Sequence, residues 1–118
     1  IVKNTGTAVS YVRVKLVMNW VDESGNVSAE PVNITPSITA DWFEQGGIYY
    51  YKMPVAAKGE TTNLLKTPIT QDAAPEGYHL EVTVLAESIQ AAPSTAVQQS
   101  WGVGVDSNGY LTQPTTTP

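Results

Sequence analysis

The side chains that could support catalysis are few. Histidine occurs once, as His79, and cysteine is absent. A zinc peptidase site of the usual kind needs two histidines one helical turn apart, with a glutamate placed as the base. A serine nucleophile would need a serine next to His79, and the sequence has no Gly-x-Ser-x-Gly turn to present one. We therefore predict that the chain is not an enzyme, that it has no catalytic residue and no cofactor, and that His79 is an ordinary strand residue.

Oxygen-bearing side chains gather in two short stretches. One holds Asp22, Glu23, Ser24 and Asn26, and the other holds Asp106, Ser107 and Asn108. Such ligands on a loop could bind Ca²⁺, but neither stretch has the ligand alternation or the distal glutamate of an EF-hand. The same residue types are common in tight turns. We predict two hairpin turns and no metal site.

An aromatic run suggests a contact surface. It consists of Trp42, Phe43, Tyr49, Tyr50 and Tyr51. Exposed aromatic faces with polar edges suit sugar rings and protein partners. Because side chains alternate along a strand, Tyr50 must face away from Tyr49 and Tyr51, so one side of the run belongs to the core. We name Tyr49, Tyr51 and Trp42 as the candidate contact surface for a glycan or a protein.

Charge and length narrow the classes of partner. The 118 residues carry eleven acidic and six basic side chains, a net charge of −5, with no run of Lys or Arg. Nucleic acid and anionic membranes would be repelled. No apolar run approaches the roughly twenty residues of a membrane-spanning helix, so we expect no membrane insertion of this domain. The length suits one domain, placed at residues 1–111, followed by a Thr/Pro-rich tail at residues 112–118. Since Ile1 opens on what resembles a strand interior, we expect a fragment of a longer precursor.

Two long strands must carry the fold. Apolar and polar residues alternate over 11–20 with Val17 as the one exception, so Val14, Leu16 and Trp20 share one face, and we assign them to the core. Residues 78–84 alternate in the same way, which adds Val82 and Val84 to the predicted core. Beyond Val84 the apolar phase slips to Leu85 and Ile89, which predicts either a bulge near Ala86 or a strand that crosses between two sheets.

Shorter elements complete the prediction. Residues 38–43 and 48–53 form a hairpin candidate around Gly46-Gly47, residues 61–65 form a short strand, and residues 110–111 form a last strand. Pro93 and Gly102 bracket a short helix near 94–101, with Trp101 in the core. We predict an all-β fold, a two-sheet antiparallel sandwich with this one helix. We expect two short polar segments to form hydrogen bonds with buried backbone groups, at a turn and at a strand end. They are Asn4-Thr5-Gly6 and Ile89-Gln90-Ala91.

Several short pieces, taken in order, resemble one family. They are Asn4-Thr5-Gly6-Thr7, Tyr11-Val12-Arg13-Val14, Asn19-Trp20-Val21-Asp22 with Gly25-Asn26-Val27, Trp42-Phe43 with Tyr49-Tyr50-Tyr51-Lys52, Lys58-Gly59-Glu60-Thr61-Thr62 with Leu64-Leu65, and Ala86-Glu87-Ser88-Ile89-Gln90-Ala91 followed by Trp101-Gly102. Together they resemble the camelysin/TasA-like, SipW-dependent exported proteins of Gram-positive bacteria. The resemblance spans Asn4 to about Val105.

The resemblance implies a jelly-roll-like sandwich and an extracellular place, at the cell surface or in a matrix. For the fibre-forming members it also implies assembly by a strand donated between subunits. We therefore expect a structural, biofilm-matrix or fibre subunit that associates with itself or with another surface protein. The alternatives are a surface module that binds a glycan or a protein and, from the label that camelysin carries, a metallopeptidase.

Overall fold

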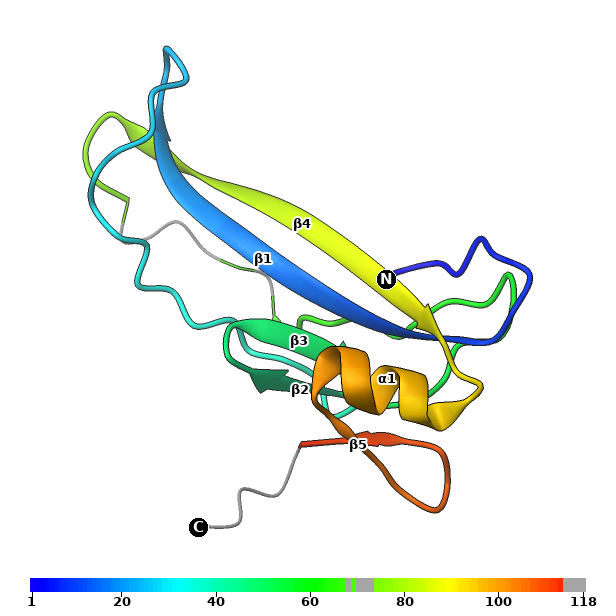
Figure 1. Ribbon diagram of the computed structural model, residues 1–118. Coiled ribbons are helices and arrows are strands. Elements are labelled where there is room, and N and C mark those ends of the chain that lie inside the picture. The colour runs from blue at the N-terminus through cyan, green and yellow to red at the C-terminus, as the bar shows by residue number, and fades with distance from the viewer. Residues whose placement is uncertain (68, 70–73, 114–118) are drawn as a thin grey trace, which may run out of the picture.

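Two antiparallel sheets and one helix make up the regular structure in the computed structural model, which describes residues 1–67, 69 and 74–113 (Figure 1). The elements are β1 (Ser10–Asp22), β2 (Trp42–Gln45), β3 (Ile48–Tyr51), β4 (Tyr78–Gln90), α1 (Ser94–Trp101), β5 (Gly104–Val105) and β6 (Leu111–Thr112). The larger sheet has the order β2-β3-β1-β4, and β5 pairs with β6 in the smaller one. The predicted all-β class is confirmed, and so is the helix at 94–101. β6 extends the ordered structure to Thr112, the first residue of the predicted tail, and residues 114–118 of that tail lie outside the described residues.

β1 and β4 form one continuous ladder. Opposite residues run from Ser10 and Gln90 to Asp22 and Tyr78 without a break, so the predicted bulge near Ala86 is wrong. The apolar phase changes at Leu85 for another reason. Val84 and Leu85 point to opposite faces and are 57% and 50% exposed, so no buried face imposes a strict alternation on this strand. In Figure 1 the ladder extends well beyond the short strands β2 and β3.

The two faces of the larger sheet have separate cores. We call face A the side that carries Val12 and Val14, and face B the side that carries Tyr11 and Arg13. The core on face A contains Val12, Val14, Trp42, Tyr49, Tyr51 and Val55, with Val2, Leu16, Ile38, Met53 and Leu64 partly buried against it. The core on face B contains Tyr11, Phe43, Tyr50, Val97, Trp101, Val103 and Leu111. The sheet therefore lies between two apolar layers.

The predicted core residues divide between the buried centre and the open end of the ladder. Val14, Trp20 and Trp101 are buried as expected, and Leu16 is partly buried. Val82 and Val84 are 37% and 57% exposed, so their assignment to the core is wrong. Both lie on β4, the last strand of the sheet, where no described strand follows and the layer over face A is incomplete.

The β2-β3 hairpin turns through two glycines. Gly46 and Gly47 have φ values of 61° and 83°, the positive values that a two-residue hairpin loop of this hand requires. The predicted strand at 38–43 is shorter than expected, because β2 begins at Trp42 after a turn in which the Trp42 N–H donates to the Thr39 carbonyl. Ile38 makes only an isolated bridge with Leu65, and this bridge replaces the strand predicted at 61–65.

In addition to its core contacts, the helix is linked to the strands of face B by one cationic side chain, that of Arg13. The Arg13 guanidinium lies 4.7 Å from the centre of the Trp101 ring and 2.8 Å from the Glu87 carboxylate, so it links α1, β1 and β4. Burial lowers the pKa of Arg13, but hydrogen bonds with Glu87 and Tyr50 outweigh this effect, and its pKa is raised above the usual value. Nearby, the Tyr11 hydroxyl donates to the Gly109 carbonyl at 2.6 Å and holds the β5-β6 hairpin against the sheet. Burial, and secondarily the charge of Asp106, raises the pKa of Tyr11.

We expect Trp101→Ala to lower the free energy of unfolding by about 3–5 kcal/mol, because it opens a cavity in the face B core and removes the support of Arg13. Val84→Ala should change it by less than about 0.5 kcal/mol, because the side chain is largely exposed. Urea unfolding of both variants measures the contrast. Equal losses would contradict the placement of the core.

Candidate functional site

The open side of β4 is the most unusual feature of the surface. β4 has thirteen residues, and all of residues 81–88 have exposed side chains. Within the described part of the chain its strand neighbour is β1 on one side only. Long exposed edges are ready templates for pairing with another strand, and natural proteins usually protect them with proline, lysine, a bulge or a covering loop. Residues 82–88 contain no proline and no lysine, and their register with β1 has no bulge.

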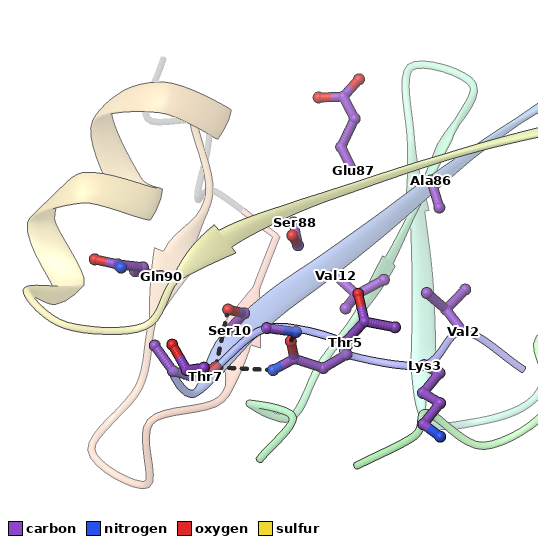
Figure 2. Close-up of a pocket in the computed structure, with 13 residues that line it drawn as sticks. Val2, Lys3, Thr5, Thr7, Ser10, Val12, Ala86, Glu87, Ser88 and Gln90 are labelled. Atoms are coloured by element: carbon purple, nitrogen blue, oxygen red, sulfur yellow. Dashed lines mark hydrogen bonds between the residues drawn. The ribbon is translucent and has the colours of Figure 1, made fainter. Parts of the chain in front are cut away.

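Two adjoining hollows lie on face A beside this strand. A polar hollow of about 500 Å³ is lined by residues 2–8, by Ser10 and Val12 of β1, and by Ala86, Glu87, Ser88 and Gln90 of β4. An apolar hollow of about 490 Å³ is lined by Val14, Leu16, Trp42, Leu64, Val82 and Val84, among others. Val2 lines both hollows. Figure 2 shows Ala86 and Glu87 on opposite sides of β4, as strand alternation requires, so the Glu87 carboxylate points away from Val12 and Ala86.

The segment before β1 forms one wall of these hollows and is paired on its other side. The Val2 N–H donates to the Thr61 hydroxyl at 2.9 Å, the Thr61 N–H donates to the Val2 carbonyl at 2.8 Å, and Lys3 makes an antiparallel bridge with Glu60. The segment is thus the start of a second layer over face A. Among the described residues, this layer covers the centre of the sheet and leaves Val82 and Val84 of β4 exposed.

Asn4 fixes the position of that wall. Its side-chain amide donates to the carbonyls of Ala8, Val55 and Ala56 at 2.9, 3.1 and 3.3 Å, and its Oδ1 accepts from the Gly6 N–H at 3.0 Å. The backbone of Asn4 is also bonded, because its N–H donates to Gly59 and its carbonyl accepts from Lys58. These bonds confirm that Asn4-Thr5-Gly6 pairs buried backbone groups. In the second predicted segment, Ile89-Gln90-Ala91, the Ala91 N–H donates to the Val9 carbonyl.

The aromatic residues proposed as a contact surface are in the core. Trp42, Tyr49 and Tyr51 are 3%, 9% and 5% exposed, and Tyr50 on the opposite face is equally buried. The expectation that one side of the run is exposed is wrong, because the Val2–Leu64 layer covers face A and α1 covers face B. Trp42 nevertheless lines the apolar hollow, and its indole Nε1 is buried without a hydrogen-bond partner. A buried side-chain N–H group without a hydrogen-bond partner is uncommon in folded proteins.

The remaining candidate residues, His79 and the two oxygen-rich stretches, do not come together in one site. His79 lies opposite Val21 near one end of the ladder. The described residues include no group of three or more His, Cys, Asp or Glu side chains placed to hold a metal ion. Both oxygen-rich stretches form turns, as predicted, since the Gly25 N–H donates to the Asp22 carbonyl and the Gly109 N–H to the Asp106 carbonyl.

The carboxylates of these turns are occupied by local hydrogen bonds. Asp22 accepts from the backbone N–H groups of Ser24 and Asn26, and Asp106 accepts from those of Asn108 and Tyr110. The backbone bond from Asn26 is the largest cause of a lowered pKa at Asp22. These oxygen atoms therefore build the turns themselves.

No family model, curated protein or solved structure matches this chain. The camelysin/TasA-like resemblance accordingly remains a prediction. Among the described residues no helix has the length and apolar character needed to cross a membrane.

The sequence analysis missed the open side of β4, although the sequence contained a signal. Between residues 80 and 89 apolar side chains occur on both faces of the strand, interrupted by Glu81, Thr83 and Glu87. This pattern suits a strand whose two faces are only partly covered.

We expect Asn4→Ala to lower the free energy of unfolding by about 2–3 kcal/mol, because it removes three hydrogen bonds to carbonyls and leaves the Gly6 N–H without its acceptor. Asn33→Ala, at an exposed position, is the matched control and should change stability by less than about 0.5 kcal/mol. Thermal and urea unfolding measure both variants. A loss at Asn4 no larger than the loss at Asn33 would show that Asn4 does not hold the wall of the hollows.

Proposed function

We propose that the chain is a non-catalytic structural protein of the cell surface or extracellular matrix, and that it assembles by accepting a strand from a neighbouring copy into the hollows beside β4. The observation that carries the proposal is that, in the part of the chain that the structure describes, the layer over face A leaves Val82 and Val84 exposed beside two adjoining hollows. The family resemblance supplies the extracellular place and the fibre context.

The hollows have dimensions that suit an extended segment. Residues 82–88 span about 20 Å at roughly 3.3 Å per residue, so a donated strand of about six or seven residues would follow both hollows. Every second side chain of the donated strand would point toward β4. Large apolar side chains suit the end at Val82 and Val84, and small or polar side chains suit the end at Ser88 and Asn4.

Strand addition fits a polymer for energetic reasons. In the layer over face A the main chain of a donated strand would pair with the segment before β1, which supplies affinity with little demand on sequence, and pockets for alternate side chains would supply specificity. Each large apolar side chain that becomes fully buried contributes about 1.5–3 kcal/mol. The exposed valines of β4 and the side chains of the incoming strand would all gain from this burial. The glycan alternative has less support, because the aromatic residues on which it was based are buried.

We expect Ala86→Arg to reduce assembly strongly, because a long charged side chain would occupy the polar hollow. Ala86 is exposed, so the fold should be retained. Ala57→Arg is the matched control, since Ala57 is an exposed residue that lines neither hollow. Size-exclusion chromatography and negative-stain microscopy of the native mature protein and both variants, each checked for folding by circular dichroism, measure the effect.

The supporting result is fibres or ladders of oligomers for the native protein and for Ala57→Arg, with monomers for Ala86→Arg. A native protein that stays monomeric under all conditions tested would overturn the proposal. So would assembly that Ala86→Arg leaves unchanged.

A further inference from the structure

A third hollow lies beside the β5-β6 hairpin, against the core of face B and apart from the two hollows on face A. Its volume is about 410 Å³, and its lining includes Phe43, Lys52, Asp106, Tyr110, Leu111 and Gln113. Small-molecule sites commonly measure about 300–1,000 Å³. We infer that this hollow binds a neutral sugar, with one pyranose ring stacked on Tyr110. The inference goes beyond the proposed assembly and does not depend on it.

Tyr110 supplies an exposed aromatic surface. Its side chain is 41% exposed, and it is the one aromatic residue among the large exposed hydrophobic residues of the described chain. An aromatic ring that stays in contact with water combines an apolar face with a polar edge, and exposed apolar surface of this kind marks contact sites. A pyranose ring carries C–H groups on its faces and hydroxyl groups around its edge. The Tyr110 ring therefore matches the face of a sugar.

The floor of the hollow is apolar and fixed. It contains Phe43 and Leu111, which are 8% and 1% exposed and belong to the core of face B. The Phe43 ring stacks on Tyr50, with ring centroids 5.1 Å apart. Close-packed core side chains keep their rotamers, so this floor gives the hollow a defined shape.

Polar side chains around the hollow have unused hydrogen-bonding capacity. Lys52 has three donors and uses one on a backbone carbonyl at 2.8 Å, and Gln113 has two amide donors and uses one on another carbonyl at 2.9 Å. The Asp106 carboxylate accepts about four hydrogen bonds and takes two from backbone N–H groups of its own turn. Lys52 and Asp106 are the charged residues of the described lining, and their formal charges cancel. This balance suits an uncharged ligand with several hydroxyl groups.

Backbone hydrogen bonds join the parts of the hollow. The Leu111 N–H donates to the Lys52 carbonyl at 2.7 Å, which ties the hairpin to the segment after β3. The Asp106 N–H donates to the Tyr110 carbonyl at 2.9 Å, and the Tyr110 N–H donates to the Asp106 carboxylate at 3.0 Å. The aromatic residue and the carboxylate thus keep a fixed relation to each other. A site that is formed in advance loses less conformational entropy when it binds.

The same bonds favour a sugar over a peptide. An extended peptide gains its affinity from free main-chain groups of the protein. Here main-chain groups of Lys52, Asp106, Tyr110 and Leu111 are bonded to one another or to the Asp106 side chain. What the hollow offers a ligand is side chains, one aromatic face and several donors and acceptors. A peptide is accordingly the competing ligand in the test.

An NMR titration of the full ¹⁵N-labelled chain tests the inference. The probes are three neutral trisaccharides, cellotriose, maltotriose and triacetylchitotriose, and an uncharged acetylated triglycine amide as the peptide. We expect at least one trisaccharide, at millimolar concentration, to cause saturable shifts of the backbone amides of residues 106–113. The peptide should cause no saturable shift there.

Two variants separate stacking from a general effect on the hairpin. Tyr110→Ala should weaken sugar binding by at least about tenfold, because it removes the aromatic face, whereas Tyr110→Phe retains the ring and should bind within about threefold of the native chain. Val27→Ala, at a residue that is 60% exposed and does not line the hollow, is the control and should bind as the native chain does. Circular dichroism checks the folding of each variant. If Tyr110→Ala does not fold, the position of the shifted amides in the native chain decides the outcome.

Each result decides the inference. Shifts at residues 106–113 that Tyr110→Ala removes and Tyr110→Phe keeps support it. The absence of saturable shifts with all three sugars overturns it, as does sugar binding that maps elsewhere, sugar binding that a folded Tyr110→Ala leaves unchanged, or an equal response to the peptide. Fibres without sugar binding would leave the proposed function standing alone, and sugar binding without fibres would leave this inference standing alone.

Discussion

The thirteen-residue ladder between β1 and β4 is the constraint on which the rest of the structure depends. β1 is the only strand of the larger sheet with a long partner on one side and a short hairpin on the other. β3 pairs only with residues 13–15 of β1, so most of the ladder extends beyond the hairpin. Within the described residues, β1 is the one strand neighbour of β4, and Val82 and Val84 are exposed.

The two cores follow from this arrangement. Because strand side chains alternate, each residue of β1 belongs to one face, and the sheet needs a separate apolar layer on each side. Face B obtains its layer from α1 and the β5-β6 hairpin, fixed by Arg13, Trp101 and Tyr11. Face A obtains its layer from irregular segments held by Asn4 and by isolated bridges. Irregular segments satisfy their amides one by one, and the described part of this layer leaves two hollows between itself and β4.

The sequence predicted the parts whose environment repeats regularly. The alternation from Tyr11 to Trp20, the Gly46-Gly47 hairpin, the helix between Pro93 and Gly102 and the role of Asn4 were all accessible from local patterns. The burial of Tyr49 and Tyr51 was not, because it depends on two distant segments that cover opposite faces. The exposure of Val82 and Val84 was also hidden, since an alternating apolar pattern shows that a face exists and does not show what covers it. The hollows, the candidate site itself, arise from the distance between the segment before β1 and β4, which no local pattern encodes.

Amide hydrogen exchange beside the hollows tests the central claim most directly. In the dilute monomer, the buried amides of β1 should stay protected. In the assembled protein, the account predicts new protection among residues 2–8, where a donated strand would fill the hollows. Assembly that protects another surface and leaves residues 2–8 exchanging at the monomer rate would contradict the account.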